Sequence, residues 1–244
     1  MKMIDIHCHL LPGVDDGPKD LQESEAMLKE LYMQGVRKVI ATPHYRKGMF
    51  EPVPHQIKSR YVQVQEIAKR IGEDLEIWLG REVHINMDID TLLEQQKYMT
   101  LAGTEYILAE FRSDVAKDFV WERISLLISL GYRPIIAHIE RYFNVACDID
   151  FVFRLSELGA KVQVNADSIL GKDGRALKHA SRKLINAGLV DFVGSDAHGK
   201  KERAPHLGKC QAYLIRKYGR AYTKRIMWSN PLRILQIKEK VSYR

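Results

Sequence analysis

Seven short apolar runs alternate along this chain with longer segments of helical periodicity. Each run is nearly continuous in Val, Ile, Leu or Ala, as parallel strands are when helices cover both of their faces. We expect strands at Met3–His7, Lys38–Thr42, Glu76–Leu79, Tyr106–Ala109, Pro134–Ala137, Lys161–Val164 and Asp191–Gly194. Such a series predicts an α/β fold with a parallel sheet and right-handed crossovers, either closed into a barrel or open and doubly wound.

The helical segments between these runs have recognisable boundary residues. Asp20 with Glu23 forms a pattern like a capping box, and Gly35 closes that helix. Four further helices are each followed by a glycine, for which we expect the left-handed cap conformation. They are His55–Ile71 before Gly72, Lys117–Leu130 before Gly131, Phe151–Leu158 before Gly159 and Arg175–Ala187 before Gly188. The first strand is followed by no Gly-rich phosphate loop, which argues against a dinucleotide-binding fold.

Length and composition limit the class of protein. The 244 residues, 45% of them hydrophobic, are expected to form one α/β barrel domain spanning residues 1–244. A net charge of +7 favours acidic partners such as phosphates, phosphoproteins or nucleic acid, with an ordinary solvated surface as the alternative. Cys8, Cys147 and Cys210 are far apart and odd in number, so we expect no disulfide framework and a reducing, cytoplasmic setting. The amino-terminal segment is too short and polar for a signal peptide, and no run of about 18 apolar residues predicts a membrane span.

Residue types that bind metals recur just after the carboxyl ends of the expected strands. They are His7, His9, Asp16, His44, Glu82, Glu110, His138, Asp196 and His198. In a parallel barrel these ends meet on one face, where active sites are built. Imidazole with carboxylate suits zinc, manganese or iron, and carboxylates readily bridge two ions. The pattern therefore predicts a metal site, and its many carboxylates fit more than one ion.

The spacing within this set supports the prediction. His7 and His9 are two residues apart on an extended segment, so both should point to one side, and Asp196 with His198 repeats the geometry. Taken singly, each residue has the alternative of being a capping or solvated group. Their common position at the strand ends outweighs that alternative. Of the other histidines, His84 shares a strand face with Glu82 and is a candidate border of the site, whereas we expect surface positions for His55, His179 and His206.

The ordered motifs resemble a known family. They are IDIHCHLLPGVDDGP at 4–18, ATPHY at 41–45, GREV at 80–83, LAEF at 108–111, AHIERY at 137–142 and GSDAH at 194–198. Together they resemble the polymerase-and-histidinol-phosphatase (PHP) superfamily and, within it, the bacterial capsule-type (CpsB/YwqE-like) protein-tyrosine phosphatases. The match covers almost the whole chain, and IHCHLLPGVDDG with AHIERY separates this group from histidinol phosphatases. The resemblance implies a distorted (β/α)7 TIM-like barrel holding three divalent metal ions, manganese foremost, with iron, cobalt or zinc as alternatives.

The resemblance also implies a ligand set for each ion. The sets are His7, His9, Glu82 and Asp196 for the first ion, Glu82, Glu110 and His138 for the second, and Asp16, His44 and His198 for the third. The choice of Asp16 over the adjacent Asp15 rests on the family pattern alone. Arg141 and Arg203 match positions that hold the substrate phosphate, although the spacing around Arg203 (HGKKERAP) departs slightly from that pattern.

The activity implied is hydrolysis of protein phosphotyrosine, with the tyrosine-rich tail of a bacterial autokinase that controls polysaccharide export as the substrate. The expected mechanism is in-line attack by a metal-bound hydroxide, while Arg141 and Arg203 neutralise the phosphoryl oxygens. A tyrosine leaving group, with a pKa of about 10, needs less general-acid help than an alkoxide. Asp196 and His198 are the nearest candidates for such an acid, and the sequence does not choose between them. It also leaves open the native metal and whether the protein is an oligomer.

Two other functions remain as alternatives, namely a phosphoesterase for a small phosphomonoester or nucleotide, and a non-enzymatic binding module with a relic site. The complete ligand set argues against a relic. Cys210 and Arg216 have the spacing of a cysteine phosphatase, but the segment between them contains no glycine and is expected to be helical, so the match is fortuitous. The basic run Arg216–Arg225 is expected to be a solvated helix face, and nucleic-acid binding is not expected.

Overall fold

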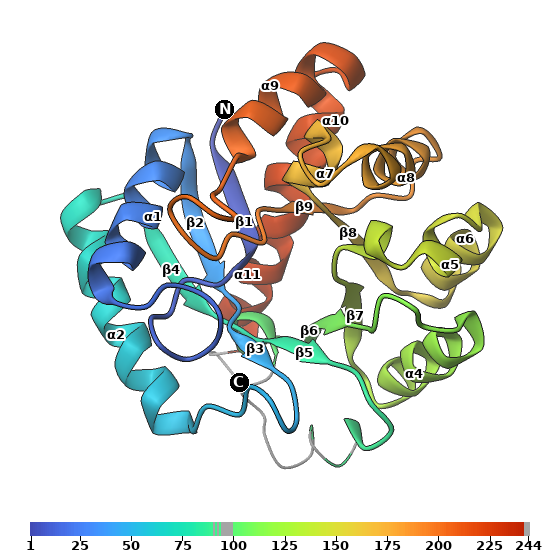
Figure 1. The fold of residues 1–244 in the computed structure, drawn as a ribbon, viewed down its shortest axis with the longest axis horizontal. Coiled ribbons are helices and arrows are strands. Elements are labelled where there is room, and N and C mark those ends of the chain that lie inside the picture. Colours follow the sequence, from blue (N-terminus) through green and yellow to red (C-terminus); the bar gives the residue numbers. More distant parts are fainter. Residues whose placement is uncertain (90, 92, 94–99, 242–244) are drawn as a thin grey trace.

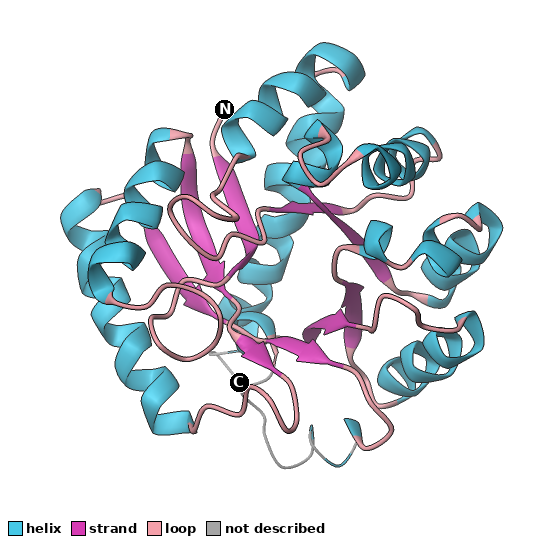
Figure 2. Cartoon of the chain, in the orientation of Figure 1, coloured by secondary structure: helices cyan, strands magenta, loops and turns pink. Residues whose placement is uncertain are grey.

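The computed structural model describes residues 1–89, 91, 93 and 100–241, and within them nine strands pair in parallel inside a layer of helices (Figures 1 and 2). The strands are β1 Met3–Cys8, β2 Val36–Ala41, β3 His44–Tyr45, β4 Glu76–Leu79, β5 Glu82–His84, β6 Tyr106–Glu110, β7 Arg133–Ile136, β8 Lys161–Asn165 and β9 Phe192–Gly194. One sheet has the order β1-β2-β4 and the other the order β3-β5-β6-β7-β8-β9. The predicted α/β class with a parallel sheet is confirmed, and the sheet is curled.

Two of the predicted strands are continued by a short second strand. β2 gives way to β3 at Pro43, which has no N–H to contribute to a ladder, and β4 gives way to β5 at Gly80. A hydrogen bond from Glu82 N to Pro43 O (3.2 Å) helps to fix the register between β3 and β5. His44 and Glu82 therefore begin the short strands β3 and β5, just after the two strands whose carboxyl ends they were expected to follow.

The carboxyl end of β9 lies against the carboxyl end of β1. Asp196 N donates to His7 O (2.8 Å), and His9 N donates to Ala197 O (2.9 Å). The strands therefore follow one another around a central axis, as Figure 1 shows, and their carboxyl ends face the same way.

Helices cover the outer side of the strands, except that α11 and η2 pack against the inner core. The helices are α1 Leu21–Met33, α2 Pro54–Ile71, α4 Lys117–Ser129, α5 Phe143–Ala146, α6 Ile149–Leu158, α7 Ala166–Leu170, α8 Arg175–Asn186, α9 Leu207–Tyr218, α10 Arg220–Lys224 and α11 Asn230–Val241, with the 3₁₀ helices η2 Leu101–Gly103 and η3 Ile139–Arg141 and the π-helix η4 Arg225–Ser229. The five predicted helices agree with α1, α2, α4, α6 and α8 to within two residues at each end. None of the described helices has the length and apolar character needed to cross a bilayer.

The boundary residues behave as predicted with one exception. Asp20 caps α1 by accepting a hydrogen bond from Glu23 N (2.9 Å). Gly35 and three of the four predicted cap glycines have positive φ, but Gly72 is extended, with a φ of −173°. A Cβ at Gly72 would lie 2.6 Å from the Tyr32 ring, so glycine is required there for close packing and the predicted left-handed cap is wrong.

Two apolar cores hold these layers together. The larger core lies between the strands and the outer helices, and the smaller one lies inside the curl of the sheet. Ile4 and Ile6 of β1 belong to the inner core, together with Ile234 and Leu235 of α11, which packs across β1 and η2. The inner core fills the space that the strands enclose beside Ile4 and Ile6. The polar side chains therefore gather at the carboxyl ends of the strands.

Candidate metal centre

A change of register at the end of β1 orients the first two histidines. Asp5 pairs with Val39 and Cys8 with Ala41, so β1 carries one extra residue between these pairs. Such a bulge shifts the alternation of side chains along a strand. Cys8 packs in the outer core, while the Nε2 atoms of His7 and His9 lie 3.3 Å apart. Both imidazoles therefore point to the same side, and the thiol does not join them.

The structure brings the nine predicted ligand residues together at the carboxyl ends of the strands. Three groups of ligand atoms each lie within 4.8 Å of one another. The groups are His7, His9, Glu82 and Asp196; His44, Glu82 and Glu110; and His9, Asp16, His44 and His198. The first group is the same as the set implied by the resemblance. In the second group His44 takes the place expected for His138, and the third group gains His9.

Glu82 lies at the middle of the cluster and is fully buried. Its Oε2 atom is 3.2 Å from His7 Nε2 and 3.0 Å from His44 Nδ1, and its Oε1 atom is 2.8 Å from His138 Nε2. Burial opposes ionisation of Glu82, but His7 and His44 outweigh burial and hold its pKa well below the usual range. Imidazoles from β1, β3 and the segment after β7 thus point at one carboxylate, and His138 borders the cluster through that carboxylate.

The geometry distinguishes Asp16 from Asp15. Asp16 Oδ1 lies 3.3 Å from His198 Nε2 and 3.5 Å from His44 Nε2, on a side chain that is about half exposed. Asp15 is buried, and its Oδ2 atom lies 2.8 Å from His9 Nδ1 and accepts from His44 N (2.9 Å). Asp16 therefore faces the centre, whereas Asp15 contacts Nδ1 of His9 and not the Nε2 atom that faces Glu82.

Both predicted arginines reach the centre through Asp196. Arg141 Nη1 lies 2.9 Å from Asp196 Oδ2, and Arg203 Nη2 lies 2.9 Å from Asp196 Oδ1. His138, Asp196 and Arg203 also have left-handed backbones, with φ of 30°, 51° and 50°. Residues with a Cβ adopt this conformation at a cost, and such strain concentrates at functional sites.

The cluster has the properties of a cation-binding site. The buried atoms Glu82 Oε2, Glu110 Oε2, His44 Nδ1 and His198 Nε2 make no hydrogen bond of suitable geometry within the described residues. Burial would lower the pKa of His7, but Glu82 and Asp196 outweigh it and raise that pKa to about 9. Burial and the Glu82 carboxylate raise the pKa of Glu110 to about 7. Buried ligand atoms that are close together without well-aligned hydrogen bonds fit divalent cations, because a cation binds such nitrogen and oxygen atoms and balances the charge of the carboxylates.

Several polar residues behind the cluster were not predicted from the sequence. Tyr142 accepts from Phe111 N (2.9 Å) and lies 3.2 Å from His138 Nδ1 through its hydroxyl. Gln163 and Asn165 of β8 are buried beside the cluster as well. The available signal was the alternation of two amides in an otherwise apolar strand, but no spacing motif connects them to the distant histidines.

The remaining histidines lie outside the three groups. His55 and His179 are exposed, as predicted. His84 is half-buried on β5, and burial and the charge of Arg46 lower its pKa. The surface position predicted for His206 is wrong, because its Nδ1 atom lies 2.9 Å from Asp167 Oδ1 and its side chain is only 18% exposed.

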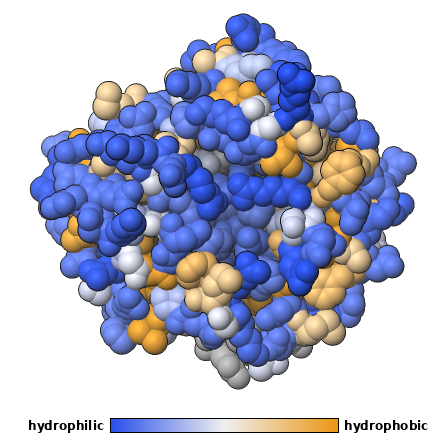
Figure 3. All heavy atoms as spheres, in the orientation of Figure 1, coloured by the Kyte–Doolittle hydropathy of each residue, from blue (hydrophilic) through white to orange (hydrophobic). Residues whose placement is uncertain are grey.

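The centre opens into a cleft of about 810 Å³ between the loops that follow β1 and β9. Asp16, His198 and Arg203 line it, together with basic and acidic side chains in equal number, namely Lys19, Lys200, Lys201, Asp20, Glu23 and Glu202. Figure 3 shows that this face of the molecule is mostly hydrophilic, with apolar side chains in small separate patches. The cluster is therefore accessible to a polar substrate from solvent.

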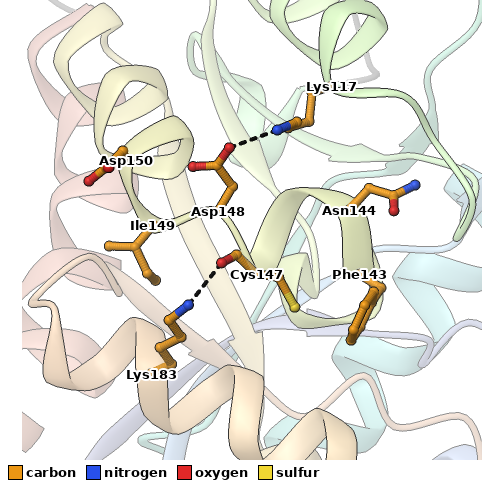
Figure 4. A pocket seen from close by; sticks show the side chains of 8 residues that line it. All are labelled: Lys117, Phe143, Asn144, Cys147, Asp148, Ile149, Asp150 and Lys183. Atoms are coloured by element: carbon orange, nitrogen blue, oxygen red, sulfur yellow. Dashed lines mark hydrogen bonds and ion pairs between the residues drawn. The ribbon is translucent and has the colours of Figure 1, made fainter.

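A second cleft, of about 540 Å³, contains none of the candidate ligands (Figure 4). Its two lysines already have partners, since Lys117 pairs with Asp148 (2.7 Å) and Lys183 donates to Cys147 O (2.8 Å). Cys147 is exposed there. Nothing in this cleft matches the chemistry of the cluster.

Cys210 lies inside helix α9, together with Arg216. It is fully buried, and burial raises the pKa of its thiol well above the usual range. A buried neutral thiol on a helix is a poor nucleophile. The helical prediction for this segment is confirmed, and the segment forms no phosphate-binding loop.

Comparisons with known proteins agree with this geometry. Residues 3–236 match the family model for capsular polysaccharide synthesis, CpsB/CapC. The tyrosine-protein phosphatase CpsB of Streptococcus pneumoniae is 36% identical over 238 residues, covering 96% of this chain and 98% of CpsB. The tyrosine-protein phosphatase YwqE of Bacillus subtilis is 34% identical over 219 residues, covering 89% of this chain and 85% of YwqE.

Solved structures show the same likeness. A structure from the crystallographic work on YwqE of Bacillus subtilis and CpsB of Streptococcus pneumoniae, described as metal-dependent tyrosine phosphatases, matches with a TM-score of 0.88 and 32% identity over 96% of this chain and 94% of that one. A histidinol phosphate phosphatase of Lactococcus lactis matches with a TM-score of 0.60 and 15% identity over 89% and 94% of the two chains, which shows a shared fold alone. From its sequence match along almost its whole length, the chain belongs to the CpsB/CapC family.

Proposed function

We propose that this protein is a metal-dependent phosphatase that hydrolyses phosphotyrosine on protein. The observation that carries the proposal is that three groups of His, Asp and Glu side chains lie together and that two arginines both contact Asp196, a member of the first group. The full-length similarity to tyrosine-protein phosphatases supports it. Bound divalent ions would supply a hydroxide nucleophile near neutral pH and neutralise charge on the phosphoryl group.

We assign three ions to the centre, with manganese as the first choice and iron, cobalt or zinc as alternatives. The proposed ligands are His7, His9, Asp16, His44, Glu82, Glu110, His138, Asp196 and His198. We likewise propose that residues 1–244 are one catalytic domain and that the nine strands represent seven units of a distorted (β/α)7 barrel, because β2 with β3 and β4 with β5 each continue one path.

Arg141 and Arg203 are proposed to bind the phosphoryl oxygens. Their side chains are 31% and 40% exposed although each contacts Asp196, and Arg203 lines the cleft. A planar guanidinium binds two phosphate oxygens at once and adds charge where it develops in the transition state.

For Asp196 and His198 we favour a ligand role over a general-acid role. Although burial opposes it, His7 and Arg141 hold the pKa of Asp196 well below its usual range. Burial and the neighbouring His9 lower the pKa of His198 to about 4. Neither side chain holds a proton to donate near neutral pH, and a tyrosine leaving group needs little such help.

Phe50 gives the site a surface suited to an aryl group. Its ring is nearly parallel to that of His44 (9°), with 5.4 Å between centroids. A tight turn fixes Phe50, because Phe50 N donates to Arg46 O (2.8 Å) and Arg46 N donates to Phe50 O (2.9 Å). An aromatic ring beside the ligand His44 favours an aryl phosphate over a small aliphatic one.

The proposed substrate is the tyrosine-phosphorylated tail of a bacterial autokinase that controls polysaccharide synthesis. Family membership and the open cleft support a peptide substrate. The alternative, a small phosphomonoester or a nucleotide, uses the same metal ligands. The distinguishing experiment compares kcat/KM for a phosphotyrosine peptide, histidinol phosphate and a short oligonucleotide, before and after metal removal. Faster turnover of histidinol phosphate or the oligonucleotide than of the peptide would refute the proposed substrate class.

A further inference from the structure

β8 differs from its neighbours in what it places at the centre. The candidate ligands come from β1, β3, β5, β6 and the segments directly after β1, β7 and β9, whereas β8 contributes none. In their place β8 presents two amides, Gln163 and Asn165, two residues apart on one face. Gln163 is 0% exposed and Asn165 is 1% exposed. Buried amides are expensive unless all their hydrogen-bonding groups are satisfied, so their partners are informative.

One backbone group fixes the orientation of both amides. His138 N donates to Gln163 Oε1 (2.8 Å), and because a backbone N–H only donates, this atom of Gln163 must be the oxygen. Gln163 Nε2 then donates to Asn165 Oδ1 (2.8 Å), and Asn165 Nδ2 donates to Asp196 Oδ2 (2.8 Å). The direction of this chain of hydrogen bonds is therefore determined from end to end.

This chain of hydrogen bonds through Gln163 and Asn165, called the relay below, also acts on His7. His7 Nδ1 lies 3.1 Å from Gln163 Oε1, which can only accept, so Nδ1 carries a proton in the charged and in the neutral ring. Nε2 faces Glu82 and Asp196 and is the atom that loses its proton when an ion binds. Gly194 of β9 allows this contact, since a Cβ there would lie 2.8 Å from His7 Cβ and 3.0 Å from Gln163 Nε2. The strand beside β8 is thus shaped to let Gln163 reach the histidine.

The relay also gives the two carboxylate oxygens of Asp196 different partners. Oδ2 receives Asn165 Nδ2 and lies 2.9 Å from Arg141 Nη1. Oδ1 faces His7 Nε2 at 3.4 Å and His9 Nε2 at 3.6 Å, inside the first ligand group. Asn165 and Arg141 therefore hold Oδ2, whereas Oδ1 is directed at the centre and accepts a hydrogen bond from Arg203 Nη2 (2.9 Å).

We propose that Gln163 and Asn165 are positioning residues that preset the tautomer of His7, the backbone of His138 and the ligand oxygen of Asp196, so that the affinity for divalent ions depends on them. The inference rests on the proposed metal centre. Partners that orient metal ligands typically change metal affinity by about 10- to 100-fold when removed.

The test uses the full chain with Gln163→Met, Asn165→Leu and both changes together, which keep side-chain length or volume and remove the amides. The zinc and manganese dissociation constants are measured by competition with a chelating dye, after circular dichroism shows that each variant is folded. Gln211→Met is the matched control, because Gln211 on α9 is a buried glutamine bonded to Met1 O (3.1 Å), outside the cluster. The exchange-protected His7 Nδ1–H proton of the zinc-loaded protein, followed by NMR, is a second readout that stability alone does not change.

We expect each single variant to bind metal about 10- to 100-fold more weakly, the double variant to bind no more weakly than the weaker single one, and Gln211→Met to match the wild type. The His7 proton should lose its protection in Gln163→Met. Folded variants with wild-type dissociation constants, or losses that add with the His7 proton still protected, would overturn the relay. Wild-type protein that binds no ion would instead refute the proposed metal centre, so the two failures are distinguishable. If Gln163→Met does not fold, the dissociation constants of Asn165→Leu for zinc and manganese decide whether the relay affects metal affinity.

Discussion

Arg141 Nη1 lies 2.9 Å from Asp196 Oδ2, so the guanidinium is held at the candidate metal centre by a carboxylate that the sequence also assigns to that centre. This contact orients one edge of the guanidinium and leaves the side chain 31% exposed towards solvent. The same residue can therefore touch the centre and a substrate phosphate.

Replacing Arg141 should impair catalysis without removing metal. Arg141→Ala is expected to lower kcat/KM for a phosphotyrosine peptide by roughly 10²- to 10³-fold, the scale of losing one preorganised donor. Metal content, measured by elemental analysis, should not change. Arg133→Ala is the control, because Arg133 pairs with Glu105 (3.4 Å) at the amino end of β7. Unchanged kcat/KM in Arg141→Ala would show that this arginine does not bind the phosphate.

Metal removal should abolish activity reversibly. We expect EDTA to inactivate the protein and manganese, or a similar ion, to restore it, because the proposed nucleophile is a hydroxide that only a bound ion makes available near neutral pH. His44→Ala and Asp196→Ala should lose nearly all activity even with added metal. Active protein containing well under one metal ion per chain would exclude a metal mechanism.

Metal binding should release protons near neutral pH. Burial alone would lower the pKa of His44, but Glu82 outweighs it and raises the pKa to about 9, as for His7. Both imidazoles are therefore protonated below pH 9 in the metal-free protein, and each must lose its proton to bind an ion. Affinity should rise between pH 6 and about 9, by up to tenfold per unit for each proton released.

Calorimetric titration at pH 7 in two buffers of different ionisation enthalpy measures this release directly. We expect about two protons or more, and much less release near pH 10. His198 contributes none, because its pKa of about 4 leaves it neutral already. Release of less than one proton at pH 7 would contradict the assignment of His7 and His44 as ligands.

Phe50 should determine the preference for aryl phosphates. Phe50→Ala is expected to lower kcat/KM for free phosphotyrosine by about fivefold, equivalent to roughly 1 kcal/mol of aromatic contact, and to leave a small alkyl phosphate unaffected. Met49→Ala changes an exposed residue of the same turn and provides the control. Equal effects on aryl and alkyl substrates would mean that Phe50 supports the fold of the turn only.

The course of the strands and the residues at their ends could be predicted because both follow from local patterns. Continuous apolar runs mark buried parallel strands, and parallel strands bring their carboxyl ends together whatever the intervening sequence. Asp15, Gln163 and Asn165 could not be assigned in this way. Their roles depend on which side chain each one meets across the molecule, such as Gln163 of β8 and His7 of β1, which are 156 positions apart.

Packing also decided the features that local rules predicted wrongly. Gly72 matches the pattern of a left-handed cap, but the Tyr32 ring occupies the space beside it and the residue is extended. His206 looks like a surface histidine, but Asp167 binds it from a different segment of the chain. In both cases the deciding neighbour is distant in sequence.

The most direct test of a metal mechanism is the turnover of a phosphotyrosine peptide by purified, folded Cys210→Ser, assayed after metal removal and again after reloading with manganese. Cys210 is buried in α9 away from the candidate ligands, and Cys8 packs in the outer core, so Cys8→Ser should behave in the same way. We expect no turnover in the stripped variant and nearly wild-type turnover after reloading. A Cys210→Ser variant that binds metal but stays inactive would contradict catalysis by the metal centre.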